Sequence, residues 1–142
     1  MKNIDNYQFN KHADEYGNLI ALEELGDIPF AIKRIYYIFD VGAEVRRGFH
    51  SHLTLNQMLI CVSGSVKIMV KTPYEENTVE LSDPSHGLYV GPMIWREMYD
   101  FSPGAVLLVL ASEHYDESDY IRNYQDYEPV AIKYFNKSCE NK

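Results

Sequence analysis

Two histidines separated by a single residue are the side chains of this sequence best placed for chemistry. His50 and His52 belong to the segment RGFHSH at residues 47–52. Side chains of an extended strand alternate between its two faces, so both imidazoles would project into the same space. An imidazole has an unperturbed pKa of ~6.5 and can take and return a proton near neutral pH. The pair therefore predicts a site for proton transfer, where a single histidine would be read as a structural residue.

Gln57 and Arg96 argue against a metal bound by this pair. The spacing H-x-H-x4-Q-x6-G resembles the first signature of the cupin barrels, most of which carry a metal-binding Glu at the place of Gln57. An amide is a poor ligand for metals that histidine favours, and the cationic Arg96 stands where a third histidine would be sought. We therefore expect no metal and no other cofactor. His86, His114 and Glu97 leave another ligand set open.

Two arginines near the histidines suit enolisation. Arg47 opens the histidine segment, and Arg96 belongs to the later segment GPMIWRE at residues 91–97. Their cations can stabilise the oxyanion that forms when a proton leaves the carbon next to a ketone. The residues alone thus suggest metal-free enolisation chemistry.

Short β-strands separated by turns must hold these residues. Aromatic residues are plentiful, with 12 Tyr and 6 Phe among 142 residues, and turn signals recur at intervals of roughly 8 to 12 residues. The pattern predicts an all-β sandwich or small barrel. The run FAIKRIYYIF at residues 30–39 predicts a central strand. Alternation divides its side chains between two faces: Arg34 and Tyr36 against Lys33, Ile35 and Tyr37.

The tail differs from the strands. In residues 115–127, Tyr120, Ile121, Tyr124 and Tyr127 recur at helical spacing. We expect a short C-terminal helix that packs on the outside of the barrel.

Length and charge limit the partners. The chain is long enough for one domain, residues 1–142. A net charge of −8 argues against a nucleic-acid surface, and no run approaches the ~20 apolar residues of a membrane span. Cys61 and Cys139 look unpaired, as in a reducing compartment. We expect a cytoplasmic protein with no nucleic-acid or membrane partner.

Several blocks of the chain together resemble the sugar 3,4-ketoisomerases, which act on thymidine-diphosphate (dTDP)-linked 4-keto-6-deoxyglucose. The blocks lie within residues 16–127: IPFAIKRIYYIFD, RGFHSH, LICVSGSVKI, GLYVGPMIWREMYDF and VLLVLASEHYDESDYIRNY. The resemblance implies an all-β cupin jelly roll, also called a double-stranded β-helix, with no metal. It also implies a homodimer that exchanges N-terminal strands, and a role in making 3-amino-3,6-dideoxyhexoses for bacterial surface polysaccharide such as the O-antigen of lipopolysaccharide.

The same resemblance assigns the catalytic roles. His50 would be the base that removes the proton at carbon 3 and delivers one to carbon 4. His52 would move a proton between the two oxygens as the enediol collapses the other way. Tyr37 and Arg47 match positions near the active site of the family.

Four further positions concern the substrate. Lys33 and Arg34 are candidates for the diphosphate, with a solvated strand charge as the alternative. Tyr16 and Arg96 match the members whose product is the gluco-configured 3-keto-6-deoxyglucose, on the route to 3-amino-3,6-dideoxyglucose. Still open are a galacto-configured product, a metal-free 3,5-epimerase and a non-catalytic cupin that binds a sugar nucleotide. A metal-dependent cupin dioxygenase ranks last.

Overall fold

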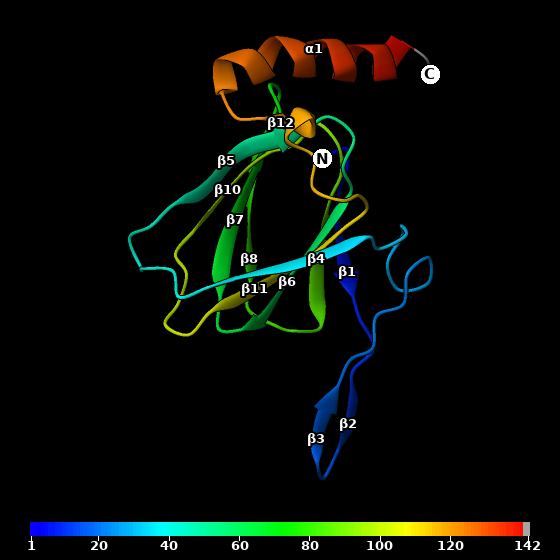
Figure 1. The fold of residues 1–142 in the computed structure, drawn as a ribbon, viewed down its shortest axis with the longest axis vertical. Helices are drawn as coiled ribbons and strands as arrows, with labels where there is room; N and C mark the ends of the chain where they lie inside the picture. The colour runs from blue at the N-terminus through cyan, green and yellow to red at the C-terminus, as the bar shows by residue number, and fades with distance from the viewer. Residues whose placement is uncertain (141–142) are drawn as a thin grey trace.

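The computed structural model describes the backbone of residues 1–140 and the side chains of residues 1–136. Two five-stranded antiparallel sheets form its body (Figure 1). The first sheet has the order β1 (Ile4–Gln8), β9 (His86–Val90), β6 (Gln57–Ser63), β11 (Val106–Ala111) and β4 (Arg34–Phe39). The second has the order β12 (Tyr120–Ile121), β5 (Arg47–His52), β10 (Trp95–Tyr99), β7 (Val66–Lys71) and β8 (Glu76–Leu81). The predicted all-β jelly roll with a C-terminal helix is confirmed.

The remaining elements surround the two sheets. A small hairpin of β2 (His12–Asp14) and β3 (Gly17–Leu19) projects away from the body in Figure 1. A 3-10 turn, η1 (Glu117–Asp119), precedes β12, and helix α1 (Tyr124–Glu140) lies across the other end of the molecule. No helix within residues 1–140 has both the length and the apolar composition needed to cross a membrane.

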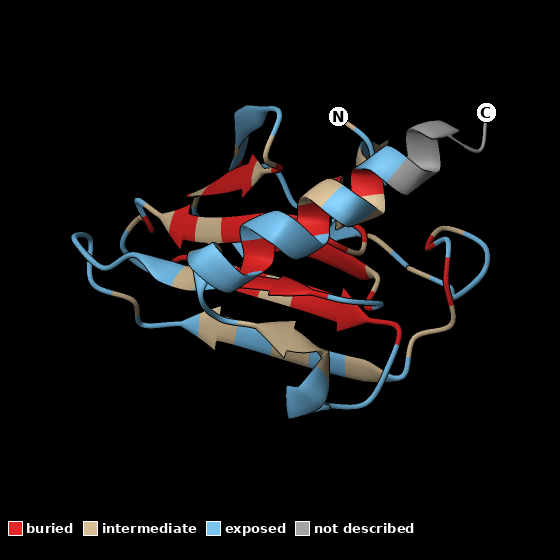
Figure 2. Ribbon diagram, turned by 90° about the horizontal axis from the view of Figure 1, so that it is seen from above, coloured by how far each residue is buried: buried red, intermediate tan, exposed pale blue. Residues whose placement is uncertain are grey.

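The main core fills the space between the sheets. In β7, Val66, Ile68 and Val70 are fully buried, whereas Lys67 and Lys71 on the other face are only partly covered and Met69 between them is 7% exposed. This alternation arises because successive side chains of a strand point to opposite faces. Figure 2 shows the same contrast across the molecule, with buried residues along the strands and exposed residues in the loops and the hairpin. Cys61 is a buried free thiol in this core, and the side chain of Cys139 lies outside the described residues.

The tail corrects one prediction. The helix begins at Tyr124 and not near Tyr115, and it extends to Glu140, so it is not short. Tyr120 and Ile121 instead form β12, which pairs with β5. The edge of β5 presents backbone groups that need hydrogen-bond partners, and this requirement outweighs the helical spacing of the two side chains.

The strand predicted at residues 30–39 is β4, which begins only at Arg34 and lies at the edge of its sheet. Its prediction as a central strand was wrong. Its outward face carries three exposed apolar side chains: Ile35, Tyr37 and Phe39, which are 58%, 62% and 55% exposed. Apolar side chains thus occupy both faces of this edge strand, which is why its sequence resembles that of a central strand.

Tyr127 fastens the helix to the second sheet. Its ring is fully buried. Its hydroxyl lies within donating distance of two backbone carbonyl oxygens, that of Met93 at 2.8 Å and that of Lys71 at 3.1 Å. We expect Tyr127→Phe to lower the free energy of unfolding by about 1–3 kcal/mol, because buried carbonyl groups lose a donor. Denaturant unfolding measures this loss. Tyr124→Phe, on a partly exposed neighbour in the same helix, should stay within ~0.5 kcal/mol of the parent; equal losses would contradict the role of the hydroxyl.

Candidate active site

A bulge in β5 directs His50 toward the space between the sheets. Opposite β10, His50 pairs with Arg96 but Gly48 pairs with Glu97, so Phe49 is an extra residue in the strand. Gly48 and Phe49 both have positive φ, 94° and 53°. A Cβ atom at Gly48 would lie 2.9 Å from the carbonyl oxygen of Arg96, so only glycine fits at this position.

The same bulge fixes the proton on the His50 ring. Its Nδ1 lies 3.0 Å from the carbonyl oxygen of Gly48. Because a carbonyl oxygen can only accept, Nδ1 carries the hydrogen and Nε2 keeps its lone pair. His50 is thus held in the tautomer that can act as a base through Nε2.

The two imidazoles lie next to each other, and the ring of one tyrosine lies close to both. His50 and His52 are buried, and their ring centroids are 4.9 Å apart in an edge-to-face arrangement. The ring of Tyr120 lies 5.2 Å from His50 and 4.3 Å from His52. Nδ1 of His52 lies 3.4 Å from Oδ2 of Asp119. The alternation of the strand has brought the histidines together, as the sequence predicts.

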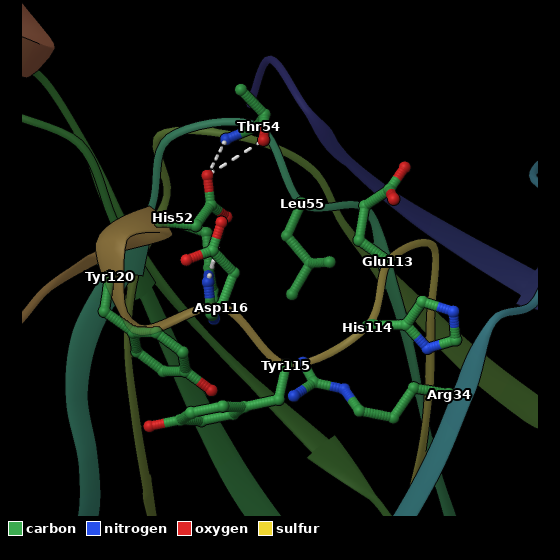
Figure 3. Close-up of a pocket in the computed structure, with 10 residues that line it drawn as sticks. Arg34, His52, Thr54, Leu55, Glu113, His114, Tyr115, Asp116 and Tyr120 are labelled. Atoms are coloured by element: carbon green, nitrogen blue, oxygen red, sulfur yellow. Dashed lines mark hydrogen bonds and ion pairs between the residues drawn. The ribbon is translucent and has the colours of Figure 1, made fainter.

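Each histidine opens to a different cavity. His52 lines a cavity of about 440 Å³, together with Arg34, Thr54, Asp119 and Tyr120 among others (Figure 3). His50 lines one of about 210 Å³, whose other walls include Tyr36, Arg47, Tyr120 and Arg122. Tyr120, whose ring lies against both imidazoles, belongs to the linings of both cavities.

Arg96 is buried beside the histidines and carries an uncompensated charge. Its guanidinium donates to the side-chain oxygen of Gln57 and, at 3.2 and 3.3 Å, to the carbonyl oxygen of Ile94. Gln57 in turn donates from Nε2 to the hydroxyl of Tyr36 at 2.9 Å. These acceptors are an amide and a backbone carbonyl, so none of them neutralises the cation. A buried cation of this kind favours a nearby anion.

Burial and this cation keep the histidines neutral. Burial first, and then the charge of Arg96, lowers the pKa of His50 to about 3. The same two causes, in the same order, lower the pKa of His52 further. Burial also lowers the pKa of Arg96 to about 10, so its guanidinium stays charged at neutral pH. The arrangement therefore presents two unprotonated imidazoles beside a fixed positive charge.

The structure brings five of the eight predicted site residues together. Besides the two histidines, Arg34 lines the larger cavity, Arg47 lines the smaller one, and Arg96 is buried opposite His50. Lys33 lies at the edge of this region, where its Nζ is 3.2 Å from Oε2 of Glu113, a residue of the larger cavity. Lys33 is thus exposed and already paired with a carboxylate.

Two predicted residues do not join the site within one chain. Tyr37 projects from the opposite face of β4, because side chains alternate, and the tyrosine that reaches the site is its neighbour Tyr36. Tyr16 is 90% exposed at the tip of the β2–β3 hairpin, which Figure 1 shows far from β5 and β12. Any contribution of Tyr16 to this site would have to come from another chain.

Four residues around the histidines were not predicted as site residues: Tyr36, Asp119, Tyr120 and Arg122. Tyr36 could have been found, because alternation places it on the face of Arg34. The other three come from the tail, where the helical pattern concealed the pairing of Tyr120 with His52.

Within the described part of the chain, no group of three or more His, Cys, Asp or Glu side chains is arranged to hold a metal ion. His86, which the sequence left open as a ligand, bonds instead to Asn6 at 2.7 Å. The absence of a metal remains a prediction.

Comparison with known proteins identifies the family. The family model "FdtA: WxcM-like, C-terminal" matches residues 2–131. The chain belongs to this family. A curated relative from Aneurinibacillus thermoaerophilus, TDP-4-oxo-6-deoxy-alpha-D-glucose-3,4-oxoisomerase, is 47% identical over 125 residues, which cover 88% of this chain and 90% of the relative. The family assignment drawn from the sequence blocks is confirmed.

Solved structures of the family share both fold and sequence. QdtA, a sugar 3,4-ketoisomerase from Thermoanaerobacterium thermosaccharolyticum in complex with TDP, is 56% identical with a TM-score of 0.94, covering 95% of this chain and 98% of that one. A His-to-Asn mutant of QdtA was crystallised with TDP-4-keto-6-deoxyglucose. The WlaRB TDP-quinovose 3,4-ketoisomerase from Campylobacter jejuni is 46% identical with a TM-score of 0.86, covering 89% of this chain and 98% of that one.

The buried histidines should make the protein sensitive to acid. The unfolded chain protonates its histidines near pH 6.5, whereas the folded chain does so only at much lower pH, so the unfolded state binds more protons in between. This contribution to stability is complete above about pH 6.5 and is lost as the pH falls toward the folded pKa values. We expect the melting temperature to fall between pH 6.5 and pH 4.5 less steeply for the double variant His50→Asn/His52→Asn than for the parent.

The exposed His12 provides the control for this experiment. His12→Asn removes an imidazole that is not buried and should leave the slope of melting temperature against pH unchanged. If all three proteins had the same slope, the histidine pair would not be held neutral by the fold.

Proposed function

We propose that this protein is a 3,4-ketoisomerase that converts dTDP-4-keto-6-deoxyglucose to dTDP-3-keto-6-deoxyglucose. The observation that carries the proposal is the pair of neutral, buried imidazoles beside the unneutralised Arg96 cation. Enolisation next to a ketone needs an unprotonated base and a positive charge for the developing oxyanion. The family membership and the names of the relatives supply the substrate class.

The reaction divides into two proton transfers. Nε2 of His50 takes the proton from carbon 3, and the electron pair of that bond forms the double bond between carbons 3 and 4 as the ketone oxygen gains charge. His52 carries the hydroxyl proton of oxygen 3 to oxygen 4, and His50 returns its proton to carbon 4. The ketone then stands at carbon 3, and both imidazoles are neutral again. Arg96 stabilises the anionic intermediate electrostatically.

The cations around the cavities suit the diphosphate. Arg34 faces the larger cavity, with its Nε buried and without a hydrogen-bond partner among the described residues. Arg47 faces the smaller cavity and is exposed at its mouth. Either arginine can bind phosphate oxygens in a bidentate manner. Lys33 would join them only if it released Glu113.

We assign the gluco-configured product to this enzyme, which would act in the cytoplasm on the route to the 3-amino-3,6-dideoxyglucose of a surface polysaccharide. Tyr16 and Arg96 match the gluco-forming members, and quinovose, in the name of WlaRB, is 6-deoxyglucose. Arg96 lies directly opposite His50 on the neighbouring strand, where it can bias the face on which carbon 4 receives its proton.

The protein is proposed to act as a homodimer that exchanges its N-terminal hairpins. Every residue of the β2–β3 hairpin is exposed, including the large apolar side chain of Leu19. The outer face of β4 exposes Ile35, Tyr37 and Phe39 on an edge strand. Exposed apolar surfaces of this kind, beside unpaired strand edges, are typical of an interface. A second copy would also bring Tyr16 to a site that its own chain cannot reach.

Turnover of the dTDP-linked 4-keto sugar tests the activity. We expect NMR spectra of the product to show a ketone at carbon 3 and an equatorial hydroxyl at carbon 4. His50→Asn should lower kcat by at least ~100-fold, as for a lost general base, while TDP binding is kept. His86→Asn, outside both cavities, is the control and should keep full activity.

Three results would contradict parts of this proposal. An axial hydroxyl at carbon 4 would reassign the product to the galacto series. A retained 4-ketone with solvent deuterium at carbon 5 would indicate a 3,5-epimerase. Binding of the sugar nucleotide without turnover would indicate a non-catalytic protein.

Sedimentation velocity tests the dimer. Phe39→Glu places a charge on the exposed face of β4, so we expect it to shift the protein from dimer to monomer by disfavouring burial of that face. Val130→Glu changes an equally apolar residue that is 43% exposed on α1 and should leave the dimer intact. A monomeric parent protein would refute the dimer. A Phe39→Glu variant that remained dimeric would show that the interface does not include the outer face of β4.

A further inference from the structure

His52 is enclosed without a satisfied ring nitrogen. Its side chain is 1% exposed, and neither Nδ1 nor Nε2 has a hydrogen bond among the described residues. The closest ionisable partner is Asp119, whose Oδ2 lies 3.4 Å from Nδ1. Leaving both nitrogens of a buried imidazole without a partner costs free energy. The carboxylate of Asp119 is the partner that lies within reach of Nδ1.

Asp119 is held in place by the loop after β5. Its Oδ1 accepts hydrogen bonds from the backbone nitrogen of Thr54 at 3.0 Å and from the Thr54 hydroxyl at 2.8 Å. Its own carbonyl oxygen accepts from the backbone nitrogen of Leu53 at 2.9 Å. The next residue, Tyr120, pairs with His52 across the strands. These contacts leave Oδ2 as the free oxygen of the carboxylate, on the side of His52.

We propose that Asp119 is the positioning residue of His52: its carboxylate accepts the Nδ1 hydrogen and thereby keeps the Nε2 lone pair directed at the substrate oxygens. The inference rests on the proposed ketoisomerase function and assigns a role to a residue outside the histidine segment. At 3.4 Å the contact is longer than a usual hydrogen bond of ~2.9 Å. The proposed role requires this contact to shorten when His52 becomes a cation, as catalytic hydrogen bonds do when the reaction complex forms.

The proton balance of the step leaves Asp119 unchanged. His52 takes the proton of oxygen 3 at Nε2 while its Nδ1 hydrogen stays on the ring. The resulting imidazolium lies between the carboxylate of Asp119 and the newly charged oxygen 4. It then gives the Nε2 proton to oxygen 4, and the neutral tautomer with hydrogen on Nδ1 is restored. Asp119 neither gains nor loses a proton in this step, and its carboxylate opposes the repulsion from Arg96.

The Nδ1 atoms of the two histidines therefore face different acceptors. His50 donates its Nδ1 hydrogen to a neutral backbone carbonyl, that of Gly48, whereas His52 faces a carboxylate. A charged acceptor stabilises an imidazolium more strongly than a neutral one. This difference suits a division in which His52 carries a proton between two oxygens while the anionic intermediate lasts.

The tautomer of His52 tests the inference without any turnover. In nitrogen-15 NMR spectra of the TDP-bound protein, we expect His52 to carry hydrogen on Nδ1, with part of the signal moving to the Nε2-protonated form in Asp119→Asn. A parent protein with hydrogen on Nε2 would overturn the proposal. Because this measurement needs no reaction, its result stands apart from any failure of the proposed isomerase activity.

Kinetics provide the second readout. We expect Asp119→Asn to lower kcat about 10-fold and Asp119→Ala about 100-fold, with KM within twofold of the parent, because the proposed role of Asp119 is exerted through His52. Thr54→Val keeps the backbone bond but loses the hydroxyl, so its loss should be smaller. Asp126→Asn removes the same charge from an exposed position in α1 and should have no effect. Unchanged kcat in Asp119→Ala, or an equal loss in Asp126→Asn, would overturn the proposal.

Discussion

The guanidinium of Arg96 is fully buried between the sheets, and its hydrogen-bond acceptors are an amide and a backbone carbonyl. Burying a charge in such surroundings costs free energy unless an anion binds beside it. In the resting protein, burial first and then this charge lower the pKa of both neighbouring imidazoles, which keeps them unprotonated. In an enolisation the same charge would also favour the anionic intermediate, so one unneutralised cation would act on both the bases and the intermediate.

The C-terminal tail supplies the residues that pack against the histidine strand. Residues 117–121 add a 3-10 turn and a two-residue strand to the free edge of β5, which places Asp119 and Tyr120 against the imidazoles. Arg122 follows at the smaller cavity, where Glu117 holds it at 2.7 and 2.8 Å. The helix then anchors this segment through the buried Tyr127. The packing of α1 therefore supports the geometry of the site as well as the stability of the fold.

The sequence allowed prediction of those features that depend on local alternation. The shared face of His50 and His52 follows from the two-residue period of a strand, and the same rule places Tyr36 on the face of Arg34. The pairing of Tyr120 with His52 could not be predicted in this way, because it depends on a free strand edge that only the assembled sheet provides. Tyr37 shows a related limit, since it matches a position near the active site of the family but projects from the outer face of β4.

The amide at Gln57 can be understood from the same electrostatics. It accepts a hydrogen bond from Arg96 and donates one to Tyr36, two roles that an ionised carboxylate could not combine. A glutamate here would form a buried ion pair with Arg96 and remove most of the positive field from the imidazoles. Their pKa values would then rise, and an anionic intermediate would meet a neutralised arginine. The proposed enolisation would therefore depend on the amide at Gln57, which leaves the charge of Arg96 unneutralised.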